Sequence, residues 1–388
     1  MSNPALIEHL IEALPKAELH LHIEGTLSPE LLFALAKKNG VELPYKTLED
    51  VRAAYNFPDL QSFLNLYYRG MSVLITEDDF AELAYAYTRM MHENRVCHAE
   101  PFFDPQGHVG RGVTFRVVYD GLQKGFKRGA AEFGISVSLI FSFLRHLSEE
   151  ECFAFVRDDT HPDNGQYIRE LFAAKAFIAV GLDSSELGNP PEKFERLFRY
   201  CREELHVPFL VAHAGEEGPP SFMYNALDVL TVDRIDHGVA ARLDGELCKR
   251  LRHQNVPLTV CPTSNVALCV FDDRAACGAA VMDLALTEKL CVTINSDDPA
   301  YLGGDVRESY RILAETGRLT PEVLKQLVLN SFYGSFLSAA QKQVYGERVE
   351  EVYKDVCCHA LLYRNVRPKI PLMEEEEEER KKAAKRLQ

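Results

Sequence analysis

Short runs of apolar, β-prone residues alternate along this chain with longer segments in which apolar side chains recur at helical spacing. The short runs predict eight strands, at residues 18–23, 97–103, 136–141, 177–182, 209–212, 234–237, 257–260 and 291–294. Helical spacing is clear at residues 79–94, 114–133, 191–204 and 245–253. Alternation favours a parallel sheet, and eight repeats predict an α/β fold of the (β/α)₈, TIM-barrel type.

An open, doubly wound sheet is the alternative architecture. It requires a glycine-rich phosphate turn after an early strand, and the chain has no G-x-G-x-x-G motif. A single barrel can accommodate 388 residues. We therefore expect one barrel domain at residues 1–372. The segment 373–388 is rich in Glu and then in Lys and Arg, which predicts a disordered or solvated tail.

A long helical insertion is predicted after the first strand, at residues 28–94, because this stretch is too long for one crossover helix. This stretch contains a stripe of aromatic and leucine side chains at helical spacing: Phe57, Leu60, Phe63, Leu64, Tyr67 and Tyr68. Such a stripe packs in a core about three times as often as it contacts a ligand.

Residues that can bind a metal follow several predicted strands. Successive side chains of a strand alternate faces, so His20 and His22 project on the same side. His213 and Asp297 follow the fifth and eighth strands, and the strand ends of a barrel share one mouth. Imidazole and carboxylate groups suit zinc, so we expect these four side chains to bind one Zn²⁺ per chain. Such an ion lowers the pKa of a bound water toward about 7.

Each of these residues also has a purely structural interpretation. An isolated H-x-H pair is about five times as often the ordinary polar face of a strand as a metal site. Several imidazoles crowded into a barrel mouth reverse these odds, because burying them unpaired is costly and a bound ion pairs them. His237 alone resembles a core histidine, yet at the sixth strand end it faces the same mouth and can orient an attacking water. Asp236 either fixes the tautomer of His237 or caps a loop, with about equal weight.

Five motifs, each at the end of a predicted strand, carry a family resemblance. They are His20-Leu21-His22-Ile23-Glu24-Gly25-Thr26-Leu27, His213-Ala214-Gly215-Glu216, Arg234-Ile235-Asp236-His237-Gly238, Cys261-Pro262-Thr263-Ser264-Asn265 and Asn295-Ser296-Asp297-Asp298-Pro299. Over roughly residues 10 to 340 the chain resembles the adenosine/adenine deaminase branch of the amidohydrolase superfamily. The strings Phe102-Phe103-Asp104-Pro105-Gln106 and Gly181-Leu182-Asp183-Ser184-Ser185-Glu186 are similar to its adenine deaminase subgroup.

The resemblance implies roles for further residues. It makes Glu216 the acid that protonates purine N1, which requires burial to raise the pKa of this carboxyl toward neutrality. It places Asp298 against purine N7 and Ser184 in the region that contacts N3. In relatives, the segment matching the aromatic stripe forms an apolar lid over the base.

Glu24 is the main departure from adenosine deaminases, which usually carry Asp at this position. It stands two residues after His22, so strand alternation directs it toward the same mouth. Its longer side chain is expected to reach the N9–N3 edge of a free base and to accept the N9–H hydrogen bond. A solvated residue at a strand end is the alternative, at about one chance in four.

These features predict a zinc-dependent hydrolase that converts adenine and water to hypoxanthine and ammonia, a reaction of purine salvage. Adenosine deamination is the runner-up, followed by deamination of an N6-substituted purine or nucleotide. A nucleotide would require basic residues at the mouth, which the motif-bearing segments lack.

Two functions of other classes are also considered. A non-catalytic metal-stabilised binding protein would not need all of the metal ligands, the acid Glu216 and His237 together. A two-metal ester or amide hydrolase usually has a bridging carboxylated lysine, whereas the fourth strand here ends Leu182-Asp183-Ser184.

Composition argues against two classes of partner, nucleic acids and membranes, and is compatible with the small-molecule purine that the resemblance implies. The net charge of −15 argues against nucleic-acid binding, and no stretch is apolar enough for a membrane span. The ten cysteines are irregularly spaced in a chain without a secretory signal, which favours free thiols and a cytoplasmic location. Nothing in the sequence indicates an oligomeric state.

Overall fold

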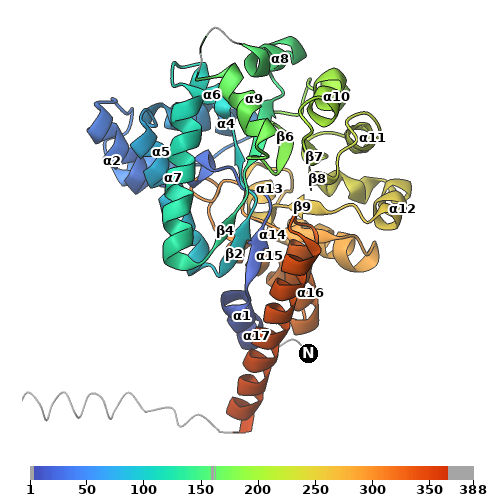
Figure 1. Cartoon of the computed structure of the whole chain (residues 1–388). Coiled ribbons are helices and arrows are strands. Elements are labelled where there is room, and N and C mark those ends of the chain that lie inside the picture. The colour runs from blue at the N-terminus through green and yellow to red at the C-terminus, as the bar shows by residue number, and fades with distance from the viewer. Residues whose placement is uncertain (1–3, 159–160, 162, 366–388) are drawn as a thin grey trace, which may run out of the picture.

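Ten parallel strand segments occupy the eight predicted strand positions in the computed structural model, which describes residues 4–158, 161 and 163–365 (Figure 1). They are β1 (Lys16–Glu18), β2 (Val96–Ala99), β3 (Phe102–Phe103), β4 (Ser136–Val137), β5 (Ile140–Leu144), β6 (Ala179–Asp183), β7 (Phe209–Ala214), β8 (Arg234–His237), β9 (Leu258–Val260) and β10 (Val292–Ile294). β3 continues the line of β2 and β5 continues that of β4, so the ten segments occupy eight positions.

The sheet closes on itself. One sheet has the order β1-β2-β4 and the other the order β10-β9-β8-β7-β6-β5-β3. Isolated parallel bridges pair Leu21 with Asp297 and His22 with Phe102, and these join the first strand position to the last and to the second. The predicted (β/α)₈ barrel is thereby confirmed, with the strand ends that carry the motifs at one mouth.

The first strand is shorter than the predicted 18–23. It ends at Glu18 because the Leu19 amide donates to the Asn295 side chain, at 2.8 Å, instead of to a neighbouring strand. Another interruption separates β2 from β3, where Pro101 has no N–H to donate. These breaks let each strand position bend while it crosses the barrel.

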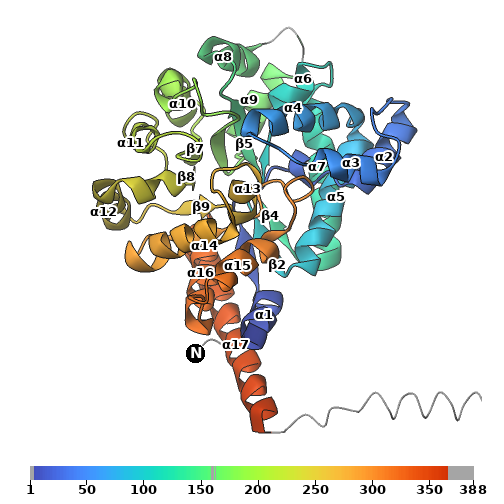
Figure 2. The same ribbon diagram turned by 180° about the vertical axis from the view of Figure 1, so that it is seen from behind.

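Helices surround the strands (Figures 1 and 2). They are α1 (Pro4–Ala13), α2 (Pro29–Asn39), α3 (Leu48–Ala54), α4 (Leu60–Gly70), α5 (Glu77–Glu93), α6 (Pro105–Val109), α7 (Phe115–Phe133), α8 (Glu149–Arg157), α9 (Gly165–Ala173), α10 (Glu195–Glu203), α11 (Pro220–Asp228), α12 (Gly245–Gln254), α13 (Pro262–Ala267), α14 (Arg274–Met282), α15 (Val306–Glu315), α16 (Pro321–Tyr333) and α17 (Ala339–Asn365). Short helical turns are η1 (Glu24–Thr26), η2 (Met71–Val73), η3 (Pro191–Phe194), η4 (Val239–Leu243) and η5 (Asp283–Thr287). All four helical segments predicted from spacing are present, within a few residues.

Local sequence sets the limits of these helices. Thr114 caps α7 by accepting the Val117 amide, and Gly134, at a φ of +67°, ends it in the left-handed conformation. Helices α1 and α17 lie at the N-terminal end of the barrel, opposite the mouth (Figure 1). The predicted tail at 373–388 lies outside the described residues.

The insertion at 28–94 consists of α2, α3, α4, η2 and α5. The stripe of apolar side chains on α4 forms a separate buried cluster with residues that follow β9 and β10. Its members are Phe57, Leu60, Phe63, Leu64, Tyr67, Met71, Leu268, Tyr301 and Leu302. Five of these side chains, Leu60, Phe63, Leu64, Tyr67 and Leu268, also line the cavity of the candidate site, so the cluster serves both packing and cavity lining.

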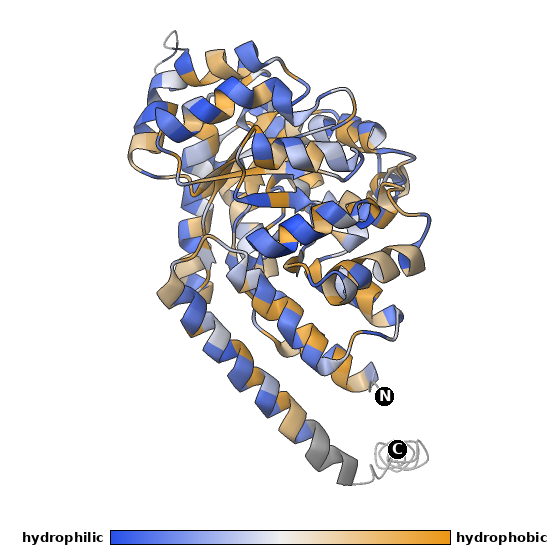
Figure 3. Cartoon of the chain, turned by 90° about the vertical axis from the view of Figure 1, so that its right-hand side faces the viewer, coloured by the Kyte–Doolittle hydropathy of each residue, from blue (hydrophilic) through white to orange (hydrophobic). Residues whose placement is uncertain are grey.

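The barrel core has two layers. Apolar strands in the centre and helices with polar outer faces are visible in Figure 3. The main apolar core joins strands to helices, while a smaller cluster of Phe102, Ile140, Ala179 and Val211 lies apart from it. None of the helices in the described part of the chain combines the length and apolarity that a membrane crossing requires.

Candidate active site

The four predicted metal ligands meet at the mouth of the barrel. Asp297 Oδ1 lies 3.3 Å from Nε2 of His20 and 3.4 Å from Nε2 of His22. The ring of His213 has its centroid 4.6 Å from that of His20 and 5.3 Å from that of His22. All four side chains are buried, and Phe102 packs beneath the three rings at centroid distances of 5.0–5.3 Å.

The partners of the imidazole Nδ1 atoms show that the ligand cluster fits a metal ion. His20 Nδ1 lies 2.8 Å from the hydroxyl of Thr259, which donates to Asp236 at 2.8 Å. His213 Nδ1 lies 3.1 Å from the Leu182 carbonyl oxygen. With Nδ1 occupied in this way, the Nε2 lone pairs face inward. His20 Nε2 is buried without a hydrogen-bond partner among the described residues, and a divalent ion would satisfy it.

Two carboxylates support these ligands from outside. Asp236 accepts a hydrogen bond from the Thr259 hydroxyl, which lies against His20. The sequence suggested that Asp236 fixes the tautomer of His237 or caps a loop, and this hydrogen bond serves neither role. Asp183 lies 3.5 Å from Nδ1 of His22 and 3.1 Å from Nδ1 of His213. A carboxylate against the outer nitrogen orients a ligating imidazole and increases its basicity. Asp183 was part of a recognised string, but its spacing gave it no role.

Glu216 and His237 are side by side next to the ligand cluster. The Glu216 carboxyl Oε2 lies 3.4 Å from His237 Nε2, and its Oε1 accepts from Asn265 Nδ2 at 3.3 Å. Burial, followed by the charges of Asp297 and Glu186, raises the pKa of Glu216 well above its ordinary value. Burial also lowers the pKa of His237 well below its ordinary value. The pair therefore offers a neutral acid beside a neutral imidazole.

Glu186 holds the loop that carries Glu216. Its carboxylate accepts the backbone amides of Gly215, Glu216 and Gly218 at 3.2, 3.3 and 2.6 Å. The side chain is buried, and charge-assisted bonds to three amides of one short loop fix the loop strongly. Glu186 is a positioning residue that the sequence pattern did not reveal.

Glu186→Gln is expected to keep the metal but to lower kcat on the order of tenfold, less than loss of the acid itself. The charge of Glu186 raises the pKa of Glu216. Its removal lowers that pKa, so Glu216 loses its proton at a lower pH and the alkaline limb of the kcat profile moves to lower pH. A pH–rate profile and metal analysis test this, with the exposed Glu192→Gln as control. An unmoved alkaline limb would contradict it.

A cavity lies between the ligand cluster and α4. Its walls are formed by His22, Leu60, Phe63, Leu64, Tyr67, Tyr68, Asp104, Asp183, Ser184, His213, Glu216, His237, Leu268, Asp297 and Asp298. These lining residues include no Lys or Arg. The cavity is thus closed by apolar side chains above and acidic groups below, which suits a flat, uncharged ring with several N–H donors.

Three of these residues have strained backbones. Ser184, His237 and Asp297 have φ values of +81°, +60° and +67°, in the left-handed region that favours glycine. Strain of this kind persists where the surrounding structure dictates a side-chain direction. The backbone is also crowded at Gly25, where a Cβ atom would clash with the Asp298 carboxyl.

Two predicted substrate contacts are less direct than expected. Ser184 lines the cavity, but its hydroxyl lies 2.8 Å from His146 Nδ1 and 3.5 Å from the Tyr68 hydroxyl. Glu24 begins the turn η1 instead of continuing a strand, and it is not among the lining residues. Its carboxylate is buried behind the wall.

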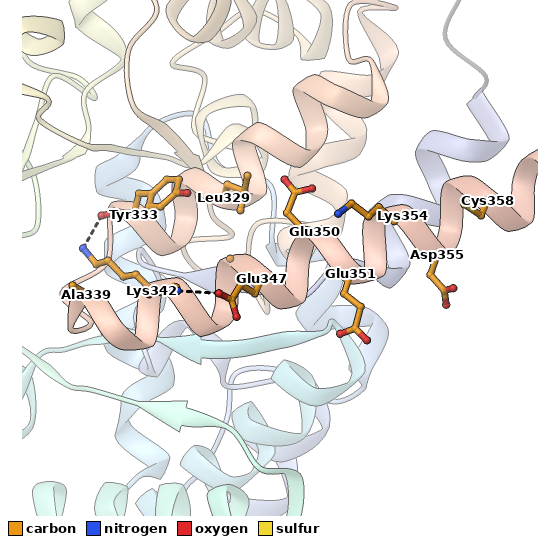
Figure 4. Close-up of a pocket in the computed structure, with 12 residues that line it drawn as sticks. Leu329, Tyr333, Ala339, Lys342, Glu347, Glu350, Glu351, Lys354, Asp355 and Cys358 are labelled. Atoms are coloured by element: carbon orange, nitrogen blue, oxygen red, sulfur yellow. Dashed lines mark hydrogen bonds between the residues drawn. The ribbon is translucent and has the colours of Figure 1, made fainter.

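A second hollow opens between α16 and α17 at the other end of the barrel (Figure 4). Its lining includes Tyr333, Lys342, Glu347 and Glu350, and no histidine. This hollow therefore contains none of the predicted metal ligands.

Comparisons with known proteins agree with this geometry. The family model described as adenosine deaminase matches residues 15–352. The adenine deaminase of Acinetobacter baylyi is 47% identical over 344 residues, which cover 88% of this chain and 98% of that protein. The crystal structure of an adenine deaminase from Arthrobacter aurescens superposes with a TM-score of 0.80 at 44% identity, covering 88% of this chain and all of that one. A zinc-bound amidohydrolase from Burkholderia ambifaria has a TM-score of 0.79 at 25% identity, covering 92% and 96%.

Proposed function

This chain belongs to the adenosine deaminase family, and we propose that it is an adenine deaminase that hydrolyses adenine to hypoxanthine and ammonia. The observation that carries the proposal is an identity of 47–48%, over 88% of this chain, with adenine deaminases that are covered to 98% of their length. The mouth of the barrel supports it, because the ligand cluster, the buried acid and the neutral imidazole lie around one cavity.

His20, His22, His213 and Asp297 would hold one zinc ion. When bound, zinc activates a water molecule at neutral pH and polarises the centre under attack. Three histidines and one carboxylate are typical zinc donors, and they leave space for water. Asp183 and Thr259 hold the three imidazoles in ligating orientation.

Glu216 and His237 perform the proton chemistry. Glu216 is buried and neutral, so it can donate its proton to purine N1 and make C6 electrophilic. The resulting carboxylate takes a proton from the attacking water and passes it to the departing amine. It then recovers a proton from the added hydroxyl as the C6=O bond of hypoxanthine forms. His237 is uncharged and points Nε2 toward Glu216 and Asp297, a direction from which it can orient that water.

Asp298 and Ser184 hold the base. Burial and the neighbouring Asp297 raise the pKa of Asp298 well above its ordinary value, so a neutral carboxyl can donate its O–H to purine N7. Ser184 stands near the N3 edge, braced by His146. Glu24 supports the N9 end of the site from behind the cavity wall, where its carboxylate accepts the Asp104 backbone amide.

A direct comparison of substrates tests the proposed function. Ammonia release is expected to give a kcat/KM for adenine at least about 10²-fold above that for adenosine. AMP is expected to be poorer still, because the lining residues supply no cation for its phosphate. A preference for adenosine would overturn the assignment of adenine while leaving deamination intact.

A further inference from the structure

The cavity wall contains a carboxyl oxygen that nothing yet described uses. Asp104 follows β3 and lines the cavity, with only 3% of its surface exposed. Its Oδ2 accepts from the Tyr67 hydroxyl at 3.3 Å. Its Oδ1 is buried without a hydrogen-bond partner among the residues that the structure describes. A buried polar oxygen in this state is expected to meet a donor when the site is filled.

Glu24 is already engaged by the protein. Its Oε1 lies 2.8 Å from His108 Nε2 and accepts the Asp104 backbone amide at 3.1 Å. Its Oε2 is 3.5 Å from the Tyr67 hydroxyl. The Glu24 carboxylate therefore meets His108, the Asp104 amide and the tyrosine that also bonds Asp104. These contacts place Glu24 behind Asp104 and not in contact with a ligand.

The other polar groups of the wall have functions elsewhere. Asp183 faces the imidazoles of His22 and His213. The Ser184 hydroxyl is bonded to His146. Glu216 and Asp298 are required at N1 and N7. The N9–H of a free purine is then the remaining donor, and Oδ1 of Asp104 is the remaining acceptor.

We propose that Asp104 accepts the N9–H of adenine through Oδ1 and so determines the preference for a free base, with Glu24 as the positioning residue that fixes Asp104. The inference rests on the proposed function. Oδ1 can accept an N–H either as a carboxylate oxygen or as the carbonyl oxygen of a neutral acid. The Glu24 bond to the Asp104 amide and the Tyr67 bond to its Oδ2 hold the side chain next to the Asp183 carboxyl, and no donor among the described residues meets Oδ1.

The expected selectivity follows from the missing donor. A purine substituted at N9 has no hydrogen to offer and leaves Oδ1 buried and unsatisfied. Sites that pair a substrate N–H reject analogues without it much more strongly than apolar pockets reject an extra methyl group. 9-Methyladenine is the smallest such analogue, because it keeps the purine ring and lacks only the N9 hydrogen.

The test compares kcat/KM for adenine and 9-methyladenine in variants. Wild type is expected to prefer adenine by about 10²-fold. Asp104→Ala and Asp104→Ser are expected to lose about 10²-fold on adenine and little on 9-methyladenine, so the ratio approaches one. Asp104→Asn retains an acceptor oxygen and is expected to keep most of the preference. Asp104 makes no side-chain capping bond to α6, so these changes leave the helix start intact.

Controls separate this role from others. Metal content and circular dichroism verify that each variant is folded and loaded, and Glu217→Gln, a change outside the cavity lining, should leave the ratio unchanged. An undiminished adenine preference in both Asp104→Ala and Asp104→Ser overturns the Asp104 assignment while the proposed function stands. If Glu24→Ala abolishes the preference and Asp104→Ala does not, Glu24 makes the contact itself. A wild type that prefers adenosine overturns both proposals.

Discussion

Glu216→Gln is expected to retain zinc and purine binding while its turnover falls about 10²–10⁴-fold. This corresponds to about 3–5 kcal/mol of barrier. Glutamine keeps the size of the side chain and can still meet Asn265 and His237, which lie 3.3 and 3.4 Å from the carboxyl. It has no proton to transfer to N1. The loss should therefore appear in kcat and much less in KM.

Steady-state kinetics together with titration of a non-hydrolysable purine measure the two parts separately. Glu217→Gln is the matched control, because this neighbouring glutamate is half-buried and is not among the residues that line the cavity. Its kcat should stay within about threefold of wild type, as for a carboxylate outside general acid–base chemistry. Near-normal turnover in Glu216→Gln would assign the acid to another residue.

His22→Ala is expected to lose most of the bound zinc, where wild type holds close to one equivalent per chain. His22 lies 3.4 Å from Asp297 through Nε2, and Asp183 faces its Nδ1. Removing an outer partner of a ligand already costs about 10–100-fold in metal affinity, so the loss of a ligand should cost more. Turnover should disappear with the metal.

Elemental analysis after dialysis against a weak chelator measures this effect. His253→Ala is the control, since this exposed histidine of α12 is remote from the cluster and should leave the zinc content unchanged. Two firmly held ions per wild-type chain, or a full equivalent in His22→Ala, would rule out the single-ion site built on these four ligands.

The barrel was predictable because it depends on local patterns repeated along the chain. Each strand needs only a short apolar run and each helix only apolar side chains at a spacing of three or four, so neighbouring residues carry the signal. The strand limits were less predictable. The first strand ends where the Asn295 side chain takes the Leu19 amide, a contact between residues 276 positions apart.

The ligand cluster was predictable for a related reason. His20 and His22 share a face by strand alternation, and the C-terminal ends of parallel strands converge, so His213 and Asp297 had to come near them. Glu216 was recognised through its motif. Its buried position and raised pKa depend on Asp297 and Glu186, which the fold brings to it from other strands.

By itself, the sequence determined the architecture, the ligand set and the class of reaction, because strand periodicity and residue chemistry are local properties. Only the tertiary structure decided which carboxylate does what. Glu24, Asp104, Asp183 and Glu186 are all acidic residues near strand ends, and nothing in their spacing separates them. Hydrogen-bond partners separate them, and such partners must lie within about 3 Å with suitable direction. That accuracy arises from the packing of distant segments, such as His108 against Glu24 and the Gly215–Gly218 loop against Glu186.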